Sequence, residues 1–302
     1  AARIMTGAAL PAGADAVVPV EDTNEKWRDE ERPLPSHIQI SRAVQPGDYV
    51  RGIGEDIEAG TTVLAQGHIL RPQEVGVLAS LGISAVSVIR RPRIAILATG
   101  DELLTVDQPL QPGKIRNSNS YAQACQIKTL GAEPIFLGIA RDTEEDVRAK
   151  LQEGLAANVD LFVSSAGVSV GAYDVVKSVL VQDGQVGFWR VRMRPGKPLA
   201  YGKYADIPYI GLPGNPVSAM VSFERFARAA ILKMAGHTQL ERPQITVRLL
   251  DAIHSDGRES YVRAIVSKTD EGEYIAKTTG SQGSHIMTSL VEANGLLIVP
   301  EG

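Results

Sequence analysis

Cysteine is almost absent from this chain of 302 residues, which contains only Cys125. A single cysteine cannot form an internal disulfide, and this favours a reducing, cytoplasmic compartment. Cys125 lies in a helix-like stretch, and none of the five histidines is near it in sequence. We therefore expect a buried, small apolar residue rather than a catalytic thiol.

Long apolar runs and a large excess of either charge are also lacking. No run approaches the ~20 residues that a membrane span needs. The formal net charge is −4, so nothing attracts nucleic acid or an anionic membrane globally, and any anion site must be local. An initial Met and a signal-like segment are missing too, so we expect that Ala1 is not the native start.

The length predicts two or three domains. Residues 1–57 mix short apolar runs with Gly, Pro and Asp, and the runs at 16–20 and 37–40 predict strands of a small β-rich domain. A charged stretch separates these two runs.

Residues 58–91 form a connecting segment of different character. Apolar spacing predicts a short helix over 74–81, capped by Gly82. A β-branched strand is expected next, over 85–89.

Residues 92–241 alternate between apolar strands and amphipathic helices. This pattern predicts an α/β sandwich around a parallel sheet, with right-handed crossovers and ligands at the carboxyl ends of the strands. The expected strands are 94–98, 133–137, 160–164, 186–189 and 209–210, and the expected helices are 119–131, 143–157 with a Thr143–Asp146 capping box, one from Asp174, and 217–234.

The helical pattern stops near residue 243. Short strands predict a small, β-barrel-like domain over 242–302. These strands are expected at 245–249, 261–266, 274–278 and 296–299. The fold class is therefore multidomain α/β, with a central parallel-sheet domain between a β-rich domain and a small β domain.

Three turn-rich loops lie within the central domain, at 164–174, 194–198 and 211–219. Glycine lets a backbone come close to a ligand, and proline fixes the loop shape. Small hydroxyl residues and free N–H groups at a helix start suit phosphate or another oxyanion. Together the loops predict a nucleotide-sized, anionic ligand.

Carboxylates follow three successive strands: Glu102 in Thr-Gly-Asp-Glu at 99–102, then Asp142, then Asp174. Converging carboxylates repel one another unless a cation is shared, and hard oxygen ligands favour Mg²⁺. The alternatives are that Asp142 and Asp174 cap helices and that Asp101 is a turn residue.

Basic residues cluster in a different part of the central domain from these carboxylates. Alternation along residues 190–194 places Arg190, Arg192 and Arg194 on one face of a strand. This face either binds an anion or is the solvated side of an edge strand. Lys197, held between prolines, can reach a phosphate.

The Gly-Asn-Pro at 214–216 precedes a helix with Asn215 as the expected cap and Pro216 near its first position. The helix start either binds phosphate or is an ordinary capped end. His254 and His285 are isolated, and we expect surface or core histidines rather than metal ligands.

These motifs, in this order, resemble the molybdopterin molybdenumtransferase family, which includes bacterial MoeA and the E domains of gephyrin. The resemblance covers the whole chain, and the flanking motifs separate this family from others that share the middle domain. The matching segments are Arg-Ile-Met-Thr-Gly at 3–7, Gly-Ala-Asp-Ala-Val-Val at 13–18, Gly-Glu-Asp-Ile at 54–57, Thr-Gly-Asp-Glu-Leu at 99–103, Gly-Val-Ser-Val-Gly at 167–171, Pro-Gly-Lys-Pro at 195–198, Leu-Pro-Gly-Asn-Pro-Val-Ser at 212–218 and Gly-Ser-His at 283–285.

The resemblance implies insertion of molybdate into adenylylated molybdopterin, with Mg²⁺-dependent release of AMP. It implies a homodimer, a transient complex with the adenylyltransferase, and no nucleic-acid or membrane partner. The implied metal ligands are Glu102, Asp142 and Asp174, which with Lys197 form the catalytic set. The implied binding residues are Thr6, Asp56, Gly167, Ser169, Arg190, Arg194, Pro213, Gly214, Asn215, Pro216, Arg263 and Ser284, with Arg263 and Ser284 beside molybdate.

This chain departs from the family pattern at several points. Arg190 and Arg194 stand where lysine is usual, which changes the anion geometry, and Ala166 replaces a usual glycine. We also expect the family's N-terminal segment, with its dimer-forming helices, and its last strand or two to be missing. Two alternative functions are a molybdopterin adenylyltransferase and a non-catalytic scaffold of the gephyrin E-domain type.

Overall fold

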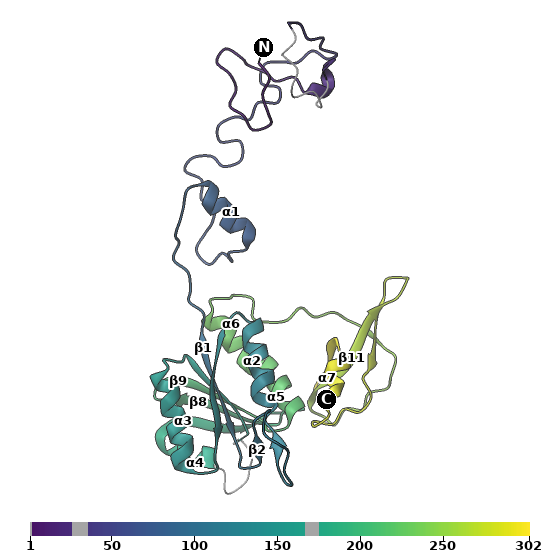
Figure 1. Ribbon diagram of the computed structural model, residues 1–302. Helices are drawn as coiled ribbons and strands as arrows, with labels where there is room; N and C mark the ends of the chain where they lie inside the picture. The colour runs from purple at the N-terminus through teal and green to yellow at the C-terminus, as the bar shows by residue number, and fades with distance from the viewer. Residues whose placement is uncertain (1, 26–35, 167–174) are drawn as a thin grey trace. The chain divides into compact units, whose positions relative to one another are not determined.

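A computed structural model describes residues 2–25, 36–166 and 175–302 (Figure 1). The chain divides into two compact units, Ala1–Ser84 and Ala85–Gly302. In the described ranges, no helix is both long enough and apolar enough to span a membrane.

The described part of the first unit contains no β-strand. It has a 3₁₀ turn, η1 (Val20–Asp22), and one antiparallel bridge between Thr23 and Ile40. The strands predicted over 16–20 and 37–40 are therefore wrong. Apolar runs make a strand only when a neighbouring ladder takes up their N–H and C=O groups, and this segment offers a single bridge.

The connecting segment contains helix α1 (Pro72–Ser80), as predicted. The Glu74 side chain accepts a hydrogen bond from the Arg71 backbone N–H at 2.8 Å and closes the helix start. Gly82, with a φ of +73°, ends the helix, because glycine adopts this left-handed conformation without strain. The strand expected over 85–89 is wrong: these residues pair with no strand and are exposed.

A six-stranded sheet forms the centre of the second unit, in the order β4-β1-β5-β9-β8-β6. Residues 94–98 of β1 are fully buried, as a strand covered on both faces of a parallel sheet must be. The first four strands of this order are parallel to one another, β8 pairs antiparallel with β9, and β6 pairs antiparallel with β8. Their bounds are β1 (Arg93–Thr99), β4 (Glu133–Ala140), β5 (Leu161–Ser165), β6 (Gly184–Arg190), β8 (Pro198–Tyr204) and β9 (Ile207–Leu212).

Helices cover both faces of this sheet (Figure 1). On one face α2 (Asn119–Thr129) packs with a continuous helical segment, α5 (Pro216–Ser222), the π-helical turn η2 (Phe223–Ala227) and α6 (Arg228–Met234). On the other face lie α3 (Glu144–Ala156) and α4 (Val175–Asp183). The predicted α/β sandwich is confirmed.

Cys125 is exposed on α2, so the expectation of a buried cysteine is wrong. The helical period turns Gln123, Ala124 and Ile127 towards the core instead.

The last part of the second unit is a small sheet in the order β10-β12-β11-β13. The predicted strands are present, although the first is shorter than expected. The short strand β7 (Met193–Arg194) joins this sheet by pairing with β11, so a central-domain segment belongs to the C-terminal sheet. The elements are β10 (Arg248–Leu249), β11 (Glu259–Lys268), β12 (Tyr274–Thr278), α7 (Thr288–Glu292) and β13 (Gly295–Val299).

Asp160 ties the segment before β1 to the start of β5. Its carboxylate accepts hydrogen bonds from the Arg90 guanidinium at 2.5 and 2.7 Å and from the Arg93 backbone N–H at 2.8 Å. Arg90 lowers the pKa of Asp160 below its ordinary value. This stabilisation is therefore present above the unfolded-state pKa and is lost as pH falls through the lowered folded-state pKa.

Asp160→Asn is expected to lower the free energy of unfolding by about 1 kcal/mol at neutral pH, because a charge-assisted contact is lost. The difference from the parent should shrink at an acidic pH below the lowered folded-state pKa, where the carboxylate of Asp160 is protonated in both states. Urea unfolding at both pH values measures this. Glu133→Gln, which breaks the exposed Arg93–Glu133 pair, is the control and should change little. An equal loss at both pH values would contradict the prediction.

Candidate functional site

The carboxyl ends of β4 and β1 carry two acidic loops that bind each other. The Asp101 N–H donates to Asp142 Oδ2 at 3.2 Å, and the Asp142 N–H donates to Asp101 Oδ1 at 3.3 Å. Since β5 lies on the other side of β1, the loop after β5 leaves from the same edge. Asp174, the third predicted ligand, follows β5 but lies outside the described residues, as do Gly167 and Ser169.

Gly100 allows the Glu102 side chain to fold back over the loop. A Cβ placed at Gly100 would lie 2.4 Å from a Glu102 carboxylate oxygen, and the φ of Gly100 is +140°. Any side chain here would both clash and strain the backbone. Glu102 itself is exposed, and none of the ion pairs among the described residues involves it.

Asp142 does not cap the helix that follows it. The N-cap of α3 is Thr143, whose hydroxyl accepts the Asp146 N–H. Asp146 in turn accepts the Arg141 N–H at 2.7 Å, so only one half of the predicted capping box is formed. The helix-cap alternative for Asp142 is therefore excluded.

The start of the loop after β5 touches the loop after β9. Ala166 has a φ of +74°, the conformation in which alanine is strained and glycine is not. Its N–H donates to Leu212 O at 3.1 Å. A Cβ placed at Gly214 would lie 3.5 Å from the Ala166 Cβ, so the two loops are in close contact.

The Pro-Gly-Asn-Pro loop over 213–216 is held from two sides. Asn119 Nδ2 donates to Gly214 O at 2.8 Å. Asn215 Nδ2 donates to Ser284 Oγ at 3.0 Å, and the Val217 N–H donates to Ser284 O at 3.1 Å. Asn215 occupies the N-cap position, but its side chain does not cap the helix. Three predicted binding residues, Gly214, Asn215 and Ser284, are thus brought together.

The Arg-Pro-Gly-Lys-Pro loop over 194–198 packs on helix α5. Gly196 has a φ of +104°, and a Cβ placed there would lie 2.3 Å from Ser222 Oγ. Lys197 is exposed beyond this contact, and it forms no ion pair within the described ranges. Its ammonium group is therefore available to a ligand.

The arginine run does not lie on one strand. The strand β6 ends at Arg190, and Arg194 belongs to β7 in the other sheet. Arg190 lines a largely apolar cavity of about 520 Å³ with Trp189, Tyr201 and Phe226. The expected common face is therefore wrong, because the chain leaves the first sheet after residue 190.

Arg263 is almost completely buried, at 1% exposed. Its Nε donates to Ser289 Oγ and its Nη2 donates to Gly283 O, each at 3.0 Å. Burial, together with the neighbouring charge of Arg194, lowers the pKa of Arg263. The contact with Gly283 O fixes the residue just before Ser284, so Arg263 orients that loop.

Thr6 and Asp56 are exposed residues of the first unit. The loops described above belong to the second unit. Over residues 2–25, 36–166 and 175–302, no group of three or more His, Cys, Asp or Glu side chains could hold a metal ion. The acidic edge offers hard carboxylate oxygens from β1 and β4, which suit a cation that takes its other ligands from water and phosphate.

Relatives of known identity match the whole sequence. It is 40% identical over 308 residues to a molybdopterin molybdenumtransferase of Nostoc sp., covering 100% of this chain and 69% of that protein. The chain belongs to the molybdopterin molybdenumtransferase family. Another member, from Haemophilus influenzae, is 37% identical over 308 residues, covering 100% of this chain and 73% of that protein.

Each part of this molybdopterin molybdenumtransferase family member matches a known region. Residues 1–82 match the MoeA N-terminal region (domains I and II), 95–233 match a probable molybdopterin-binding domain, and 246–302 match the MoeA C-terminal region (domain IV). A solved MoeA protein from Pyrococcus horikoshii is 29% identical with a TM-score of 0.74, covering 99% of this chain and 70% of that one. The resemblance stated from sequence motifs is confirmed.

Proposed function

We propose that this chain inserts molybdate into adenylylated molybdopterin and releases AMP. One observation carries the assignment of the site. A row of groups follows the carboxyl edge across β4, β1, β5 and β9: Asp142, then Glu102, then Ala166 in contact with Gly214. Asn215 extends the row to Ser284 of the C-terminal part. Acids at one end and polar donors at the other suit a molecule with a pyrophosphate and a second anionic centre.

In this proposal, Glu102, Asp142 and Asp174 would hold Mg²⁺ beside the bound substrate. When bound, Mg²⁺ would neutralise the charge that develops as the phosphoanhydride breaks. The residues themselves position the substrate: the backbone N–H groups of Gly214 and Asn215 bind the phosphates, and Pro213 and Pro216 keep the loop rigid. Gly167 and Ser169, which lie outside the described residues, are assigned to the same phosphates by their place in the family motif.

Cations and hydroxyls take the remaining anionic groups. Lys197 neutralises phosphate charge. Arg190 and Arg194 stand where relatives usually have lysine, and their planar guanidinium groups donate paired hydrogen bonds to an anion. Arg263 and Ser284 lie on the molybdate side, where N–H and O–H donors suit a tetrahedral oxyanion.

The first unit completes the site in a homodimer. We infer that Thr6 and Asp56 reach the site of a partner subunit, because both are exposed polar residues in motifs that the family shares. The low cysteine content is the basis for placing this activity in the cytoplasm, with the adenylyltransferase as the transient partner that delivers the substrate.

The deciding assay is AMP release from adenylylated molybdopterin in the presence of molybdate and Mg²⁺. We expect release that stops with EDTA and resumes with added Mg²⁺. An adenylyltransferase would instead consume ATP and unmodified molybdopterin. Nucleotide binding without turnover of either substrate would favour the scaffold function.

Lys197→Ala is expected to weaken binding of the pterin nucleotide about five- to twentyfold, because one charge-assisted contact to phosphate is lost. Calorimetry with the variant measures this. Lys203→Ala is the matched control, since Lys203 is an exposed lysine near the far end of β8. Unchanged affinity in Lys197→Ala would leave that lysine as a solvated surface residue.

A further inference from the structure

A second cavity, of about 210 Å³, lies where the central domain meets the C-terminal sheet. Two guanidinium groups, those of Arg194 and Arg263, line it, and Ser260 adds a hydroxyl. Arg263 forms no ion pair with any described carboxylate. The cavity wall therefore carries more positive charge than its protein partners balance.

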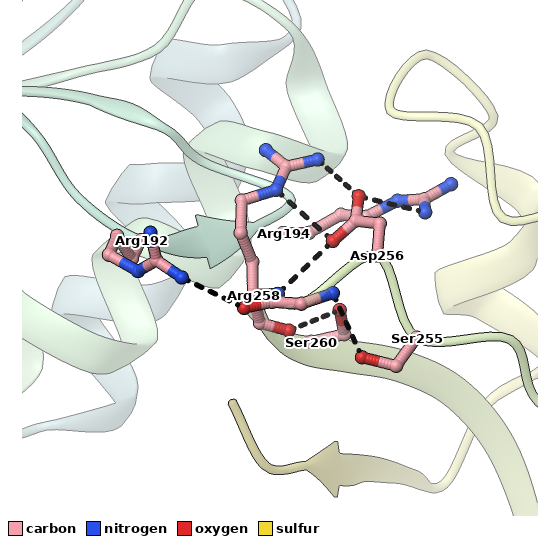
Figure 2. Close-up of polar contacts among 7 residues, drawn as sticks. Arg192, Arg194, Ser255, Asp256, Arg258 and Ser260 are labelled. Carbon is pink, nitrogen blue, oxygen red and sulfur yellow. Dashed lines mark hydrogen bonds and ion pairs between the residues drawn. The ribbon is translucent and has the colours of Figure 1, made fainter. Parts of the chain in front are cut away.

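Asp256 is the carboxylate that balances part of this charge. Its Oδ2 lies 3.2 Å from Arg194 Nη1 and 2.5 Å from Arg258 Nη2. Its Oδ1 accepts hydrogen bonds from Arg258 Nε at 3.2 Å and from the Arg258 backbone N–H at 3.3 Å. Figure 2 shows Asp256 between the two arginines. Arg258 thus binds the Asp256 carboxylate through three hydrogen bonds, and Arg194 binds it through one.

The loop around Asp256 is fixed on both sides. The Gly257 N–H donates to Ser255 Oγ at 3.1 Å, and Ser260 Oγ donates to Arg258 O at 3.1 Å. Arg192 Nη2 donates to Gly257 O at 3.1 Å (Figure 2). The loop around the carboxylate is therefore held by contacts other than the one with Arg194.

We propose that Asp256 is an internal competitor for the substrate oxyanion, holding Arg194 until a tetrahedral anion displaces it. The inference rests on the proposed function and adds a residue that sets anion affinity. A carboxylate and an oxyanion are both negatively charged hydrogen-bond acceptors for a guanidinium N–H. A single N–H group cannot form a good hydrogen bond with both at the same time. Displacement costs little, because Arg258 keeps its three contacts with Asp256 after Arg194 turns to the anion.

The competition predicts a specific effect of neutralising Asp256. Asp256→Asn should tighten binding of molybdate about two- to fivefold, since the lost pair is half-exposed and such pairs are weak. In the AMP-release assay, the KM for molybdate should fall by the same factor with kcat unchanged. Asp256→Glu keeps the charge and should bind molybdate as the parent does.

Glu301→Gln is the matched control. Glu301 forms an ion pair with Arg192, which lies two residues before Arg194 in the sequence. Glu301 does not line the cavity. Its neutralisation removes the same charge and should leave molybdate affinity unchanged. Equal tightening in Glu301→Gln would show a general charge effect and overturn the proposal.

Calorimetry with molybdate alone, on the whole chain, separates this inference from the proposed function. Tighter binding in Asp256→Asn without AMP release in either protein would support the competitor and reject the insertase reaction. Normal AMP release with unchanged or weaker molybdate binding in a folded Asp256→Asn protein would reject the competitor alone. Absence of molybdate binding to both proteins would also overturn it.

Discussion

Glu102→Gln is expected to lower the rate of AMP release at least about a hundredfold while leaving the protein folded. The substitution keeps the shape of the side chain and removes one of the carboxylates assigned to Mg²⁺. Glu102 is exposed and forms no ion pair among the described residues, so the fold loses little. Initial rates with saturating Mg²⁺, together with the thermal midpoint, measure both effects.

The control for Glu102→Gln is Glu133→Gln. Glu133 lies at the opposite, amino end of the sheet, at the start of β4, so the same charge is removed far from the carboxyl edge. Its AMP release should match the parent. Normal release from a folded Glu102→Gln protein would show that Glu102 is not a ligand of the metal ion.

The central domain was predictable because its strands and helices differ sharply in apolar pattern. Residues 94–98 are apolar throughout and fully buried in β1, and Gly131 ends the α2 segment with a φ of +75°. These local sequence patterns predict the observed elements correctly because the tertiary packing favours the same secondary structure. The strand β8 escaped prediction, because Pro198, Gly202 and Lys203 weaken the apolar alternation of a strand that pairs on both sides.

Predictions failed where a segment depends on a distant partner. The run 190–194 reads as one alternating strand, but its last two residues pair with β11, far along the chain. Local periodicity contains no information about such a change of sheet. For the same reason, the strands expected in residues 16–20 and 85–89 do not form without a ladder to join.

The acidic edge was predictable in part. Residue type and position after a strand indicated Glu102 and Asp142, because parallel strands bring their carboxyl ends to one edge. Asn119 and Asp256 were missed: each acts through a contact with a residue more than 60 positions away. The only local signal for Asn119 was a polar side chain at a helix start.

Gly196→Ala is expected to lower the free energy of unfolding of the second unit by about 2–4 kcal/mol. Two costs add: alanine is strained at a φ of +104°, and its Cβ would lie 2.3 Å from Ser222 Oγ. For a unit of this size, the thermal midpoint should fall by roughly 5–15 °C. Molybdopterin nucleotide binding should also weaken, because the loop that presents Lys197 shifts.

Two further variants separate strain from clash. Gly113 has a φ of +74° and no atom within 4 Å of an added Cβ, so Gly113→Ala reports the strain alone, at about 1 kcal/mol. Ser222 Oγ is buried and has no hydrogen-bond partner among the described residues, so Ser222→Ala should be tolerated. In the double variant that combines Gly196→Ala with Ser222→Ala, the loss of unfolding free energy should approach the loss in Gly113→Ala. If the double variant is as unstable as Gly196→Ala, the hydroxyl is not the obstacle, and backbone strain together with the 3.2 Å approach to Met193 Cε requires glycine at this position.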